Sequence, residues 1–544
     1  MTAERYSDPV EEASRCLLCH DPPCNAACKR GSDPAAFIRG VRFGLGASAL
    51  SSVADCADCK SCEKACIHYD FPLRITELRR MLEPGGGPRS GEEMRGALRG
   101  GIPPLRGEAE DPRSGAVARG EISPPSLEIE FCGLKCENPF FLSSSIVAAD
   151  YAMCARALDM GWAGIVYKTI GYGEIRDVSP RFDSIGKERT PFIGFRNLEQ
   201  ISSRPAADNF ADLARLKRDF PGKVIAASIM GQNEAEWTAL AAESERAGVD
   251  MIECNFSCPH MSESGLGSDV GQDPRLVAAF TRAVRRGSGL PVLAKMTPNL
   301  ASVIPSAEAA LCAGADGIAA INTVKSFTGF DAETERALMD VNGRACVSGY
   351  SGKAVKPIAL RFVSEIKTWP GTRDAPVSGM GGIETWRDAV DFILLGCGNV
   401  QVTTAVMQYG ARIIDPLLRG LADYMTRQGI ASITGLVGRG LGVFAPANEL
   451  DRVSIASVVH HGEKCLGCGR CYISCRDAGH GAVSWDGERR LPLIDSARCA
   501  GCHLCLQVCP AEGALGAGER VMSNSTFSVE LPYPSVRFHE KTVG

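Results

Sequence analysis

Sixteen of the 24 cysteines in this 544-residue chain fall into four groups of four, with two groups toward each end of the sequence. In a protein kept in the cytosol, dense Cys-x2-Cys spacing indicates metal binding, because disulfides are rare there. The first residues are acidic and lack the apolar core of a secretory signal, and no run of about 18 apolar residues predicts a membrane span. The net charge of −5 gives no reason to expect a nucleic-acid partner. We therefore expect a soluble, cytoplasmic metalloprotein.

The two groups nearest the C-terminus share the spacing Cys-x2-Cys-x2-Cys-x3-Cys, and Pro510 follows the last cysteine. In ferredoxins this spacing lets three thiolates of one run and the last thiolate of the other run hold each [4Fe–4S] cluster. A pair of structural zinc sites is the alternative, but zinc favours separate Cys-x2-Cys knuckles over this doubled pattern. We predict one cluster at Cys465, Cys468, Cys471 and Cys509, and a second at Cys499, Cys502, Cys505 and Cys475.

The two N-terminal groups are less regular. The first has the spacing Cys-x2-Cys-x4-Cys-x3-Cys, and the second repeats the ferredoxin spacing. Eight cysteines suit two further [4Fe–4S] clusters, although a single cluster or a mixed site stays open. By analogy with the exchange of ligands above, we expect one cluster at Cys16, Cys19, Cys24 and Cys66, and the other at Cys56, Cys59, Cys62 and Cys28.

Short apolar runs alternate with longer amphipathic runs between residues 126 and 450. Eight such strand-like runs, separated mostly by helical stretches, predict an α/β fold with a (β/α)8 TIM barrel. A doubly wound open sheet is the alternative, and the count of eight favours the barrel. The predicted strands are Phe140–Ser143, Gly164–Lys168, Val224–Ile229, Met251–Asn255, Val292–Lys295, Gly317–Asn322, Pro376–Gly379 and Val400–Thr403.

Composition divides the rest of the chain. The stretch after the first cysteine groups is rich in glycine, proline and charged residues, and it has too little apolar surface to fold alone. We expect a helical iron–sulfur domain at 1–82, a linker at 83–125, the barrel at 126–450, a ferredoxin-like domain at 451–515 and a polar tail at 516–544.

Clusters at both ends move electrons singly, so a centre that handles electron pairs is expected between them, and a flavin has this property. Gly379-Met380-Gly381-Gly382 follows the seventh predicted strand, and Thr403-Thr404 ends the eighth. In barrels these two loops form the recurring phosphate site, although a glycine-rich turn can also be only a tight turn. Lys168 and Lys295 end two other strands. They either emerge into solvent or place positive charge beside the flavin.

The segment Asn255-Phe256-Ser257-Cys258-Pro259-His260 ends the fourth predicted strand, and a glycine-rich stretch follows it. Such a stretch is typical of a mobile lid that carries a reactive residue. A thiol has a pKa near enough to neutrality to act as a general acid or base. An inert, packed cysteine is the alternative for Cys258, and it is the expected state of Cys254.

Three motifs together resemble the catalytic part of the dihydropyrimidine dehydrogenase family. They are the Asn255–His260 segment, Ala294-Lys295-Met296-Thr297-Pro298-Asn299 and Ile321-Asn322-Thr323-Val324. The resemblance runs over roughly 126–515 and is closest to the FMN and iron–sulfur subunit of the bacterial NAD-dependent enzymes. Dihydroorotate dehydrogenases share the barrel, but their motif generally has asparagine where this chain has His260.

The resemblance implies roles for matching positions. Cys258 would exchange a proton at C5 of a pyrimidine while the flavin exchanges a hydride at C6, and Lys168 and Lys295 would lie beside the flavin ring. The implied substrate-binding residues are Asn197, Asn255, His260, Asn322 and Thr323. The other implied FMN-binding residues are Ser144, Gly352, Gly381, Gly382, Thr403 and Thr404.

The animal-type enzymes of this family carry FAD and NADPH domains where this chain has residues 83–125. No Gly-x-Gly-x-x-Gly follows a predicted strand here, and Gly438–Gly442 has the wrong spacing. We therefore expect a separate FAD- and NAD(P)-binding flavoprotein subunit to exchange electrons with this chain, and a homo-oligomer of such heterodimers stays open.

The expected function is the interconversion of uracil or thymine and their 5,6-dihydro forms. A dihydroorotate dehydrogenase or another FMN-dependent ene-reductase is one rival. A non-catalytic electron-transfer scaffold is the other.

Overall fold

The computed structural model describes residues 9–67, 73–83, 124–185, 193–257, 268–478 and 481–522. The chain divides into two compact units, with the division in its C-terminal part between Phe444 and Ala445. The first unit holds the N-terminal cysteine domain and the barrel, and the second holds the C-terminal cysteine domain. The expected linker at 83–125 lies from 84 to 123 outside the described residues. Within the described segments, no helix combines the length and the apolar character needed to cross a membrane.

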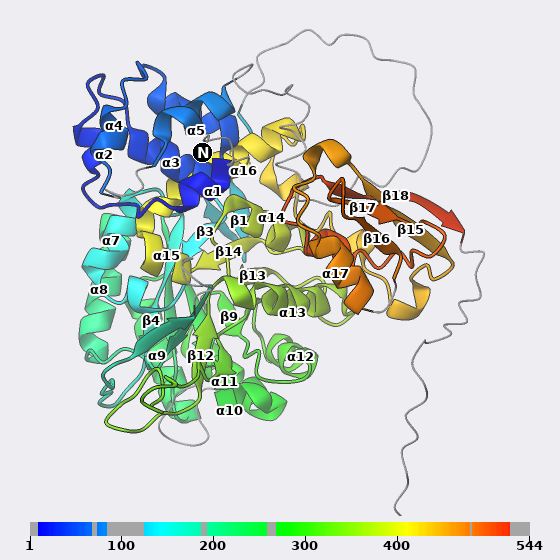
Figure 1. The fold of residues 1–544 in the computed structure, drawn as a ribbon. Coiled ribbons are helices and arrows are strands. Elements are labelled where there is room, and N and C mark those ends of the chain that lie inside the picture. The colour runs from blue at the N-terminus through cyan, green and yellow to red at the C-terminus, as the bar shows by residue number, and fades with distance from the viewer. Residues whose placement is uncertain are drawn as a thin grey trace, which may run out of the picture. The chain divides into compact units, whose positions relative to one another are not determined.

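Eight parallel strands close into a barrel at the centre of the first unit (Figure 1). The ring closes because β14 pairs with β3, which confirms the predicted barrel and rules out the open sheet. Every residue of these strands is buried, as expected for parallel strands covered on both faces. The strands are β3 (Phe140–Leu142), β4 (Gly164–Ile170), β7 (Val224–Ile229), β8 (Met251–Asn255), β9 (Val292–Lys295), β10 (Gly317–Ala320), β13 (Val377–Met380) and β14 (Asn399–Val402).

Helices follow each strand and form the outer ring. Several begin at a polar residue whose side chain accepts a hydrogen bond from the first turn, such as Asp150, Asn233 and Asp273, and Thr385 forms a full capping box with Asp388. The ring consists of α7 (Tyr151–Asp159), α8 (Ala206–Asp219), α9 (Glu234–Arg246), α10 (Ser268–Gln272), α11 (Pro274–Gly287), α12 (Ile304–Cys312), α13 (Lys356–Thr368), α14 (Trp386–Leu394), α15 (Thr404–Tyr409) and α16 (Ile414–Arg427).

A second, four-stranded antiparallel sheet is built from the segments that follow β4 and β10. Its order is β11 (Val324–Ser326), β12 (Ser348–Ser351), β6 (Gly194–Asn197) and β5 (Phe182–Ile185). Since these segments leave the carboxyl ends of barrel strands, the sheet belongs to the face where barrels carry their active sites. A two-stranded hairpin, β1 (Ile129–Phe131) and β2 (Leu134–Cys136), precedes the barrel.

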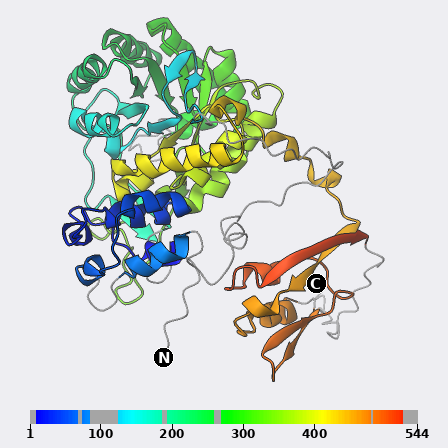
Figure 2. The same cartoon turned by 90° about the horizontal axis from the view of Figure 1, so that it is seen from above.

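The N-terminal domain is helical and has its own apolar core, which includes Phe37, Ile38, Val41 and Leu78. Figure 2 shows its helices beside α16 of the barrel. Hydrogen bonds from Arg419 on α16 to Ser48 and Ser51 join the two. The helices are α1 (Pro9–Ser14), α2 (Pro23–Ala26), α3 (Pro34–Arg42), the 3-10 helix η1 (Gly46–Val53), α4 (Ser61–Lys64) and α5 (Ile75–Leu82).

The described part of the C-terminal domain has two antiparallel ribbons, two α-helices and the 3-10 helix η8 (Gly462–Lys464). Its ribbons pair β15 (Ser454–His460) with β18 (Leu515–Met522) and β16 (Val483–Asp486) with β17 (Leu491–Ile494). The helices are α17 (Arg470–Asp477) and α18 (Leu504–Gln507). The predicted tail from residue 516 is wrong for 516–522, which belong to β18. That strand is largely exposed, so it lacks the alternation of apolar residues that would have revealed it.

Candidate active site and cysteine-lined cavities

One cavity opens at the carboxyl ends of the barrel strands. Its wall holds every described residue that the sequence predicts for the substrate and FMN sites. The structure therefore brings together residues that are spread over 260 positions of the chain, from Ser144 to Thr404. These residues are Ser144, Lys168, Asn197, Asn255, Lys295, Asn322, Thr323, Gly352, Gly381, Gly382, Thr403 and Thr404.

A buried polar network lies in the barrel interior beneath this cavity. Lys295 donates to Glu253 at 3.0 Å, and these side chains are only 4% and 0% exposed. Gln401 donates to the second oxygen of Glu253 at 2.9 Å and to Ser378 at 2.9 Å. A buried ion pair is tolerated only when its remaining polar atoms are bonded, and Gln401 provides this for Glu253. The amide oxygen of Gln401 is itself buried without a hydrogen-bond partner in the protein.

The second lysine of the cavity is also paired. Lys168 Nζ lies 2.7 Å from Glu199, and both side chains are nearly buried. Neither lysine emerges into solvent, so that alternative is wrong for both. Each instead presents an ammonium group whose charge is balanced by a carboxylate at the cavity.

Amide and hydroxyl side chains form a bonded row across one wall of the cavity. The Asn255 amide donates to Thr169 at 2.9 Å, and Thr169 in turn contacts the Ser144 hydroxyl at 3.1 Å. The side-chain amide of Asn322 donates to the Ser257 hydroxyl at 2.8 Å. It also donates to the side-chain oxygen of Asn255 at 3.4 Å. These bonds fix the rotamers of the asparagines, so their remaining donor and acceptor capacity is held in one direction.

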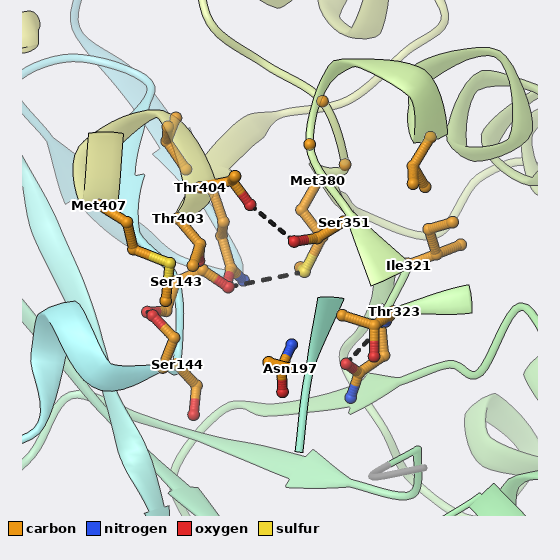
Figure 3. A pocket seen from close by; sticks show the side chains of 18 of the residues that line it. Ser143, Ser144, Asn197, Ile321, Thr323, Ser351, Met380, Thr403, Thr404 and Met407 are labelled. Carbon is orange, nitrogen blue, oxygen red and sulfur yellow. Dashed lines mark hydrogen bonds between the residues drawn. The ribbon is translucent and has the colours of Figure 1, made fainter. Parts of the chain in front are cut away.

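Backbone without side chains lines another part of the cavity. Gly381 and Gly382 have φ of +121° and +76°, and a Cβ on Gly382 would stand 2.9 Å from the Gly352 carbonyl oxygen. Any other residue at Gly382 would be strained and crowded, which leaves exposed backbone at this point. Ser351 and Thr404 share a hydrogen bond of 2.8 Å beside it. Figure 3 shows the Ser351 and Thr404 side chains pointing toward each other across this bond.

Charged side chains lie next to the turn at Gly381 and Gly382. Burial raises the pKa of Glu384, which lines the cavity, to about 6, although the nearby Lys353 acts in the opposite direction. Burial also raises the pKa of Asp388, but Lys353 and Lys356 outweigh it and hold that pKa below its usual value. The two lysines are thus fixed by Asp388 next to the glycine turn.

Two predicted residues, Cys258 and His260, lie outside the described residues. The last described residue before them is Ser257, which is buried and donates to Asn255. Cys254 is fully buried, and burial raises its pKa far above the usual value of a thiol. It is packed in the barrel core, as expected for an inert cysteine.

The C-terminal cysteines surround two cavities. Within the described segments, no three Cys, His, Asp or Glu side chains converge as they would on a single metal ion. The cysteines instead stand around hollow spaces, and each space brings together three members of one run and the last member of the other. One cavity is lined by Cys465, Cys468, Cys471 and Cys509, and the other by Cys475, Cys499, Cys502 and Cys505.

One of the two N-terminal cysteine sets also surrounds a cavity. Cys28 joins Cys56, Cys59 and Cys62 around one cavity. Burial raises the pKa of Cys16, and the thiols of Cys19 and Cys66 are close enough to act in the same direction. Burial and the neighbouring Cys16 also raise the pKa of Cys24 to about 12. These thiols are the ones that the sequence groups together, and iron would have to displace their protons.

The glycine-rich segment Gly438–Gly442 lies in turns that lead into the 3-10 helix η6 (Leu441–Val443). A nucleotide fingerprint needs its glycines between a strand and the helix that follows. The segment therefore does not have that context.

The sequence reasoning missed several residues of the cavity region, chiefly Glu253, Gln401, Glu199 and Thr169. Glu253 had a readable signal, because it interrupts an apolar strand two positions before Asn255 and therefore shares a face with it. Gln401 interrupts its strand in the same way. Glu199 follows β6, a strand that the sequence did not predict, so its pairing with Lys168 had no signal.

Two family profiles match this chain. The profile of the family described as dihydroorotate dehydrogenase matches residues 126–425, and that of the 4Fe-4S dicluster domain matches residues 458–516. The subunit PreA of NAD-dependent dihydropyrimidine dehydrogenase from Escherichia coli (strain K12) is 54% identical over 72% of this chain and 95% of that protein.

More distant relatives match smaller parts. The chloroplastic dihydropyrimidine dehydrogenase (NADP(+)) of Arabidopsis thaliana is 38% identical over 61% of this chain and 81% of its own length. The catalytic subunit of dihydroorotate dehydrogenase B (NAD(+)) from Pyrococcus horikoshii is 34% identical over 58% of this chain and 98% of its own length.

The two profiles fall on the barrel and on the C-terminal cysteine domain, and residues before 126 lie outside both. The match to PreA spans nearly the whole of that protein, which confirms the resemblance read from the motifs. The chain therefore belongs to the dihydropyrimidine dehydrogenases, oxidoreductases whose barrel is of the dihydroorotate dehydrogenase family, and it carries both a C-terminal 4Fe-4S dicluster domain and an additional cysteine-rich N-terminal domain.

Proposed function

We propose that this chain is the FMN- and iron–sulfur-containing subunit of an enzyme that interconverts uracil or thymine and their 5,6-dihydro forms. The observation that carries the proposal is the placement of three asparagines and two glutamate-paired lysines in one cavity. Amide side chains both donate and accept, which suits the alternating donors and acceptors of a pyrimidine edge. Two of the relatives are named for the same substrate class.

The charge balance of the cavity supports an uncharged substrate. Lys168 and Lys295 line it, and each already faces a glutamate. A carboxylate substrate such as orotate needs a cation of its own, because an unpaired buried charge is costly. Uracil and thymine carry no charge and need none.

The cavity fits FMN. The backbone at Gly352, Gly381 and Gly382 with the hydroxyls of Ser351 and Thr404 would hold its phosphate, since bare N–H groups and hydroxyls suit an anion. Lys168, Lys295 and the unpartnered oxygen of Gln401 would meet its ring. Bound FMN supplies the hydride for C6 of the pyrimidine ring.

Cys258 gives the proton to C5 and is protonated again from solvent. The described residues support this role by their position: Ser257, the residue before Cys258, is bonded to Asn255 and Asn322 in the substrate wall. The asparagines would hold the ring by its imide and amide edges, which fixes the direction in which its C5–C6 bond points.

The four cysteine sets would hold four [4Fe–4S] clusters, which exchange electrons with a separate FAD- and NAD(P)-binding subunit. Two relatives are themselves named as subunits, which supports a partner. The purified chain is expected to show no oxidation of NADH or NADPH, and robust oxidation without a partner would contradict the two-subunit arrangement.

The proposed function is tested on anaerobically purified protein reduced with dithionite. Flavin reoxidation by uracil or thymine, but not by orotate, is the expected result. Reoxidation by orotate alone would instead assign the chain to dihydroorotate oxidation. No reoxidation by any of the three would contradict the proposed substrate class.

Cys258→Ala tests the proton donor. General acids contribute about 10²–10⁴-fold, so pyrimidine turnover should fall by that factor while the FMN content stays unchanged. Cys254→Ala is the matched control, because it removes a thiol four residues away that lies in the barrel core. Wild-type turnover in Cys258→Ala would exclude the thiol as the acid.

A further inference from the structure

One carboxylate in the barrel interior binds two side chains of the cavity wall. Glu253 on β8 is completely buried and is not one of the residues that line the cavity. It accepts a hydrogen bond from Lys295 on β9 at 3.0 Å and another from Gln401 on β14 at 2.9 Å. Both of these residues do line the cavity. Glu253 therefore lies directly behind the wall that would meet the flavin ring.

Stability does not explain a charge at this position. The attraction within a buried ion pair often fails to offset the cost of removing both charges from water, and apolar side chains of similar size are often as stable. Ile252 and Cys254, the neighbours of Glu253 on β8, are fully buried and apolar. A charged side chain in an otherwise apolar part of the strand therefore points to a role in the chemistry of the cavity.

The hydrogen bonds of Glu253 leave its two partners little freedom. Lys295 donates to one carboxylate oxygen and Gln401 donates to the other. Gln401 also donates to the Ser378 hydroxyl at 2.9 Å, so two acceptors share its amide nitrogen. Because a carboxylate only accepts hydrogen bonds, the amide nitrogen of Gln401 has to face Glu253. Glu253 thus fixes the orientation of one cavity side chain and balances the charge of another.

The two lysines of the cavity differ in where their carboxylate lies. Lys168 pairs with Glu199, which itself lines the cavity. Within the described segments, the one ion pair of Lys295 is with Glu253, which reaches the cavity only through its partners. Charges act on one another more strongly in a buried site than in water, because the effective dielectric constant is lower. The charge of Glu253 is therefore felt in the cavity although its side chain is not exposed there.

We infer that Glu253 is a positioning residue that sets the midpoint potential of the bound FMN, because its negative charge offsets the charge that Lys295 presents to the flavin ring. This inference rests on the proposed function, which places FMN in this cavity. Uptake of two electrons and one proton, the equivalent of one hydride, gives the flavin one additional negative charge. A cation beside the ring favours this reduced form, and a carboxylate behind the cation opposes it. Glu253 thus keeps the reduced flavin a stronger hydride donor than Lys295 alone would allow.

Glu253→Gln tests this role, because it removes the charge and keeps the size of the side chain. The midpoint potential of the FMN is measured anaerobically against a reference dye, on the full-length protein without a pyrimidine or a partner subunit. The potential should rise by about 30 mV or more, which is a tenfold shift of a two-electron equilibrium toward reduced flavin. Glu253→Asp is the matched control, since it shortens the side chain but keeps the charge. It should leave the potential near the wild-type value.

A second pair of variants tests the same charge if Glu253→Gln does not retain FMN. Lys295→Met leaves the carboxylate without its cation and should lower the potential. Lys295→Met combined with Glu253→Gln removes both charges and should raise the potential again toward the wild-type value. This comparison is made at alkaline pH, so that the unpaired carboxyl group is ionised.

Two results would overturn the inference. One is a wild-type potential in Glu253→Gln, and the other is an equal potential in Lys295→Met and in the double variant. A larger shift in Glu253→Asp than in Glu253→Gln would also contradict it, because packing rather than charge would then set the potential. Absence of flavin from the wild-type protein would instead contradict the proposed function, and the absorption spectrum shows this before any titration.

Discussion

The two cysteine domains of this chain arrange the same number of thiols in different ways. In the N-terminal domain the buried core contains Phe37, Ile38, Val41 and Leu78 besides two cysteines. In the described part of the C-terminal domain the buried core contains Val458, Ala482, Val483 and Ala514 besides three cysteines. A small domain with so little apolar surface usually needs metal to fold. The N-terminal domain has a larger apolar core, so we expect it to keep its fold without bound iron.

The two domains also differ in attachment. The N-terminal domain shares one compact unit with the barrel and contributes Phe43 to the barrel core, whereas the C-terminal domain forms a unit of its own. The comparison teaches that ligand spacing identifies a cluster site, while the residues around it decide how far the domain depends on its iron.

Removal of iron is the strongest way to break this comparison. Chelation under anaerobic reducing conditions should unfold the C-terminal domain, because three of its few buried side chains would be unliganded thiols. The N-terminal domain should keep α3 and α5, which pack through apolar side chains. Hydrogen exchange measures both in one sample. Equal loss of protection in β15 and in α3 would show that the two domains depend on iron alike.

Gly44→Ala tests the attachment of the N-terminal domain. Gly44 has φ of +84°, and an added Cβ would collide with the Arg387 side chain and stand 3.3 Å from the Trp386 indole nitrogen. The left-handed conformation costs an L-residue about 1–2 kcal/mol, and the lost contact with the barrel adds to this. Hydrogen exchange in α15 (Thr404–Tyr409) and in the 3-10 helix η4 (Ala411–Ile413) should increase, because the N-terminal domain would separate from the barrel more often.

Gly31→Ala is the control for that variant. Gly31 has φ of +68°, but nothing lies within 4 Å of the position of its Cβ. Gly31→Ala should lower the stability only by the cost of the left-handed backbone conformation, and it should leave hydrogen exchange in α15 unchanged. If both variants loosen α15 equally, the contact between Gly44 and Trp386 does not hold the domains together.

The barrel was predictable because its strands are covered on both faces, so each reads as an apolar run ending in polar residues. Lys168, Asn255 and Lys295 stand at or near such endings, which is why the candidate site could be named from the sequence. Glu253 could have been noticed because it interrupts an apolar strand, but its pairing with Lys295 and the pairing of Glu199 with Lys168 join different elements, and no local pattern predicts them. The hydrogen bond from Arg412 to the Leu18 carbonyl joins residues nearly 400 positions apart, so no local sequence pattern could predict it either.

The smallest predicted difference concerns acid stability. Burial raises the pKa of Asp58, but hydrogen bonds from Arg80 and Arg79 outweigh it and leave this pKa below its usual value. A depressed folded pKa means that the stabilisation is present above the unfolded pKa, near 4, and is lost as the pH falls through the folded pKa. Asp58→Asn should therefore destabilise α5 at neutral pH by up to about 1 kcal/mol, the usual limit for such exposed pairs, and the deficit should shrink in acid.

Asp477→Asn in the C-terminal domain is the matched control. Arg476 lowers the pKa of Asp477 as well, but it is the preceding residue, so the pair persists in the unfolded chain and adds nothing to folding. Hydrogen exchange of α5 and α17, corrected for the intrinsic rate at each pH, compares the two variants. Since Asp58 bonds to arginines about 20 positions away, only Asp58→Asn should lower the stability of the folded protein. A pH-independent deficit in Asp58→Asn would mean that the carboxylate acts by packing rather than by its charge.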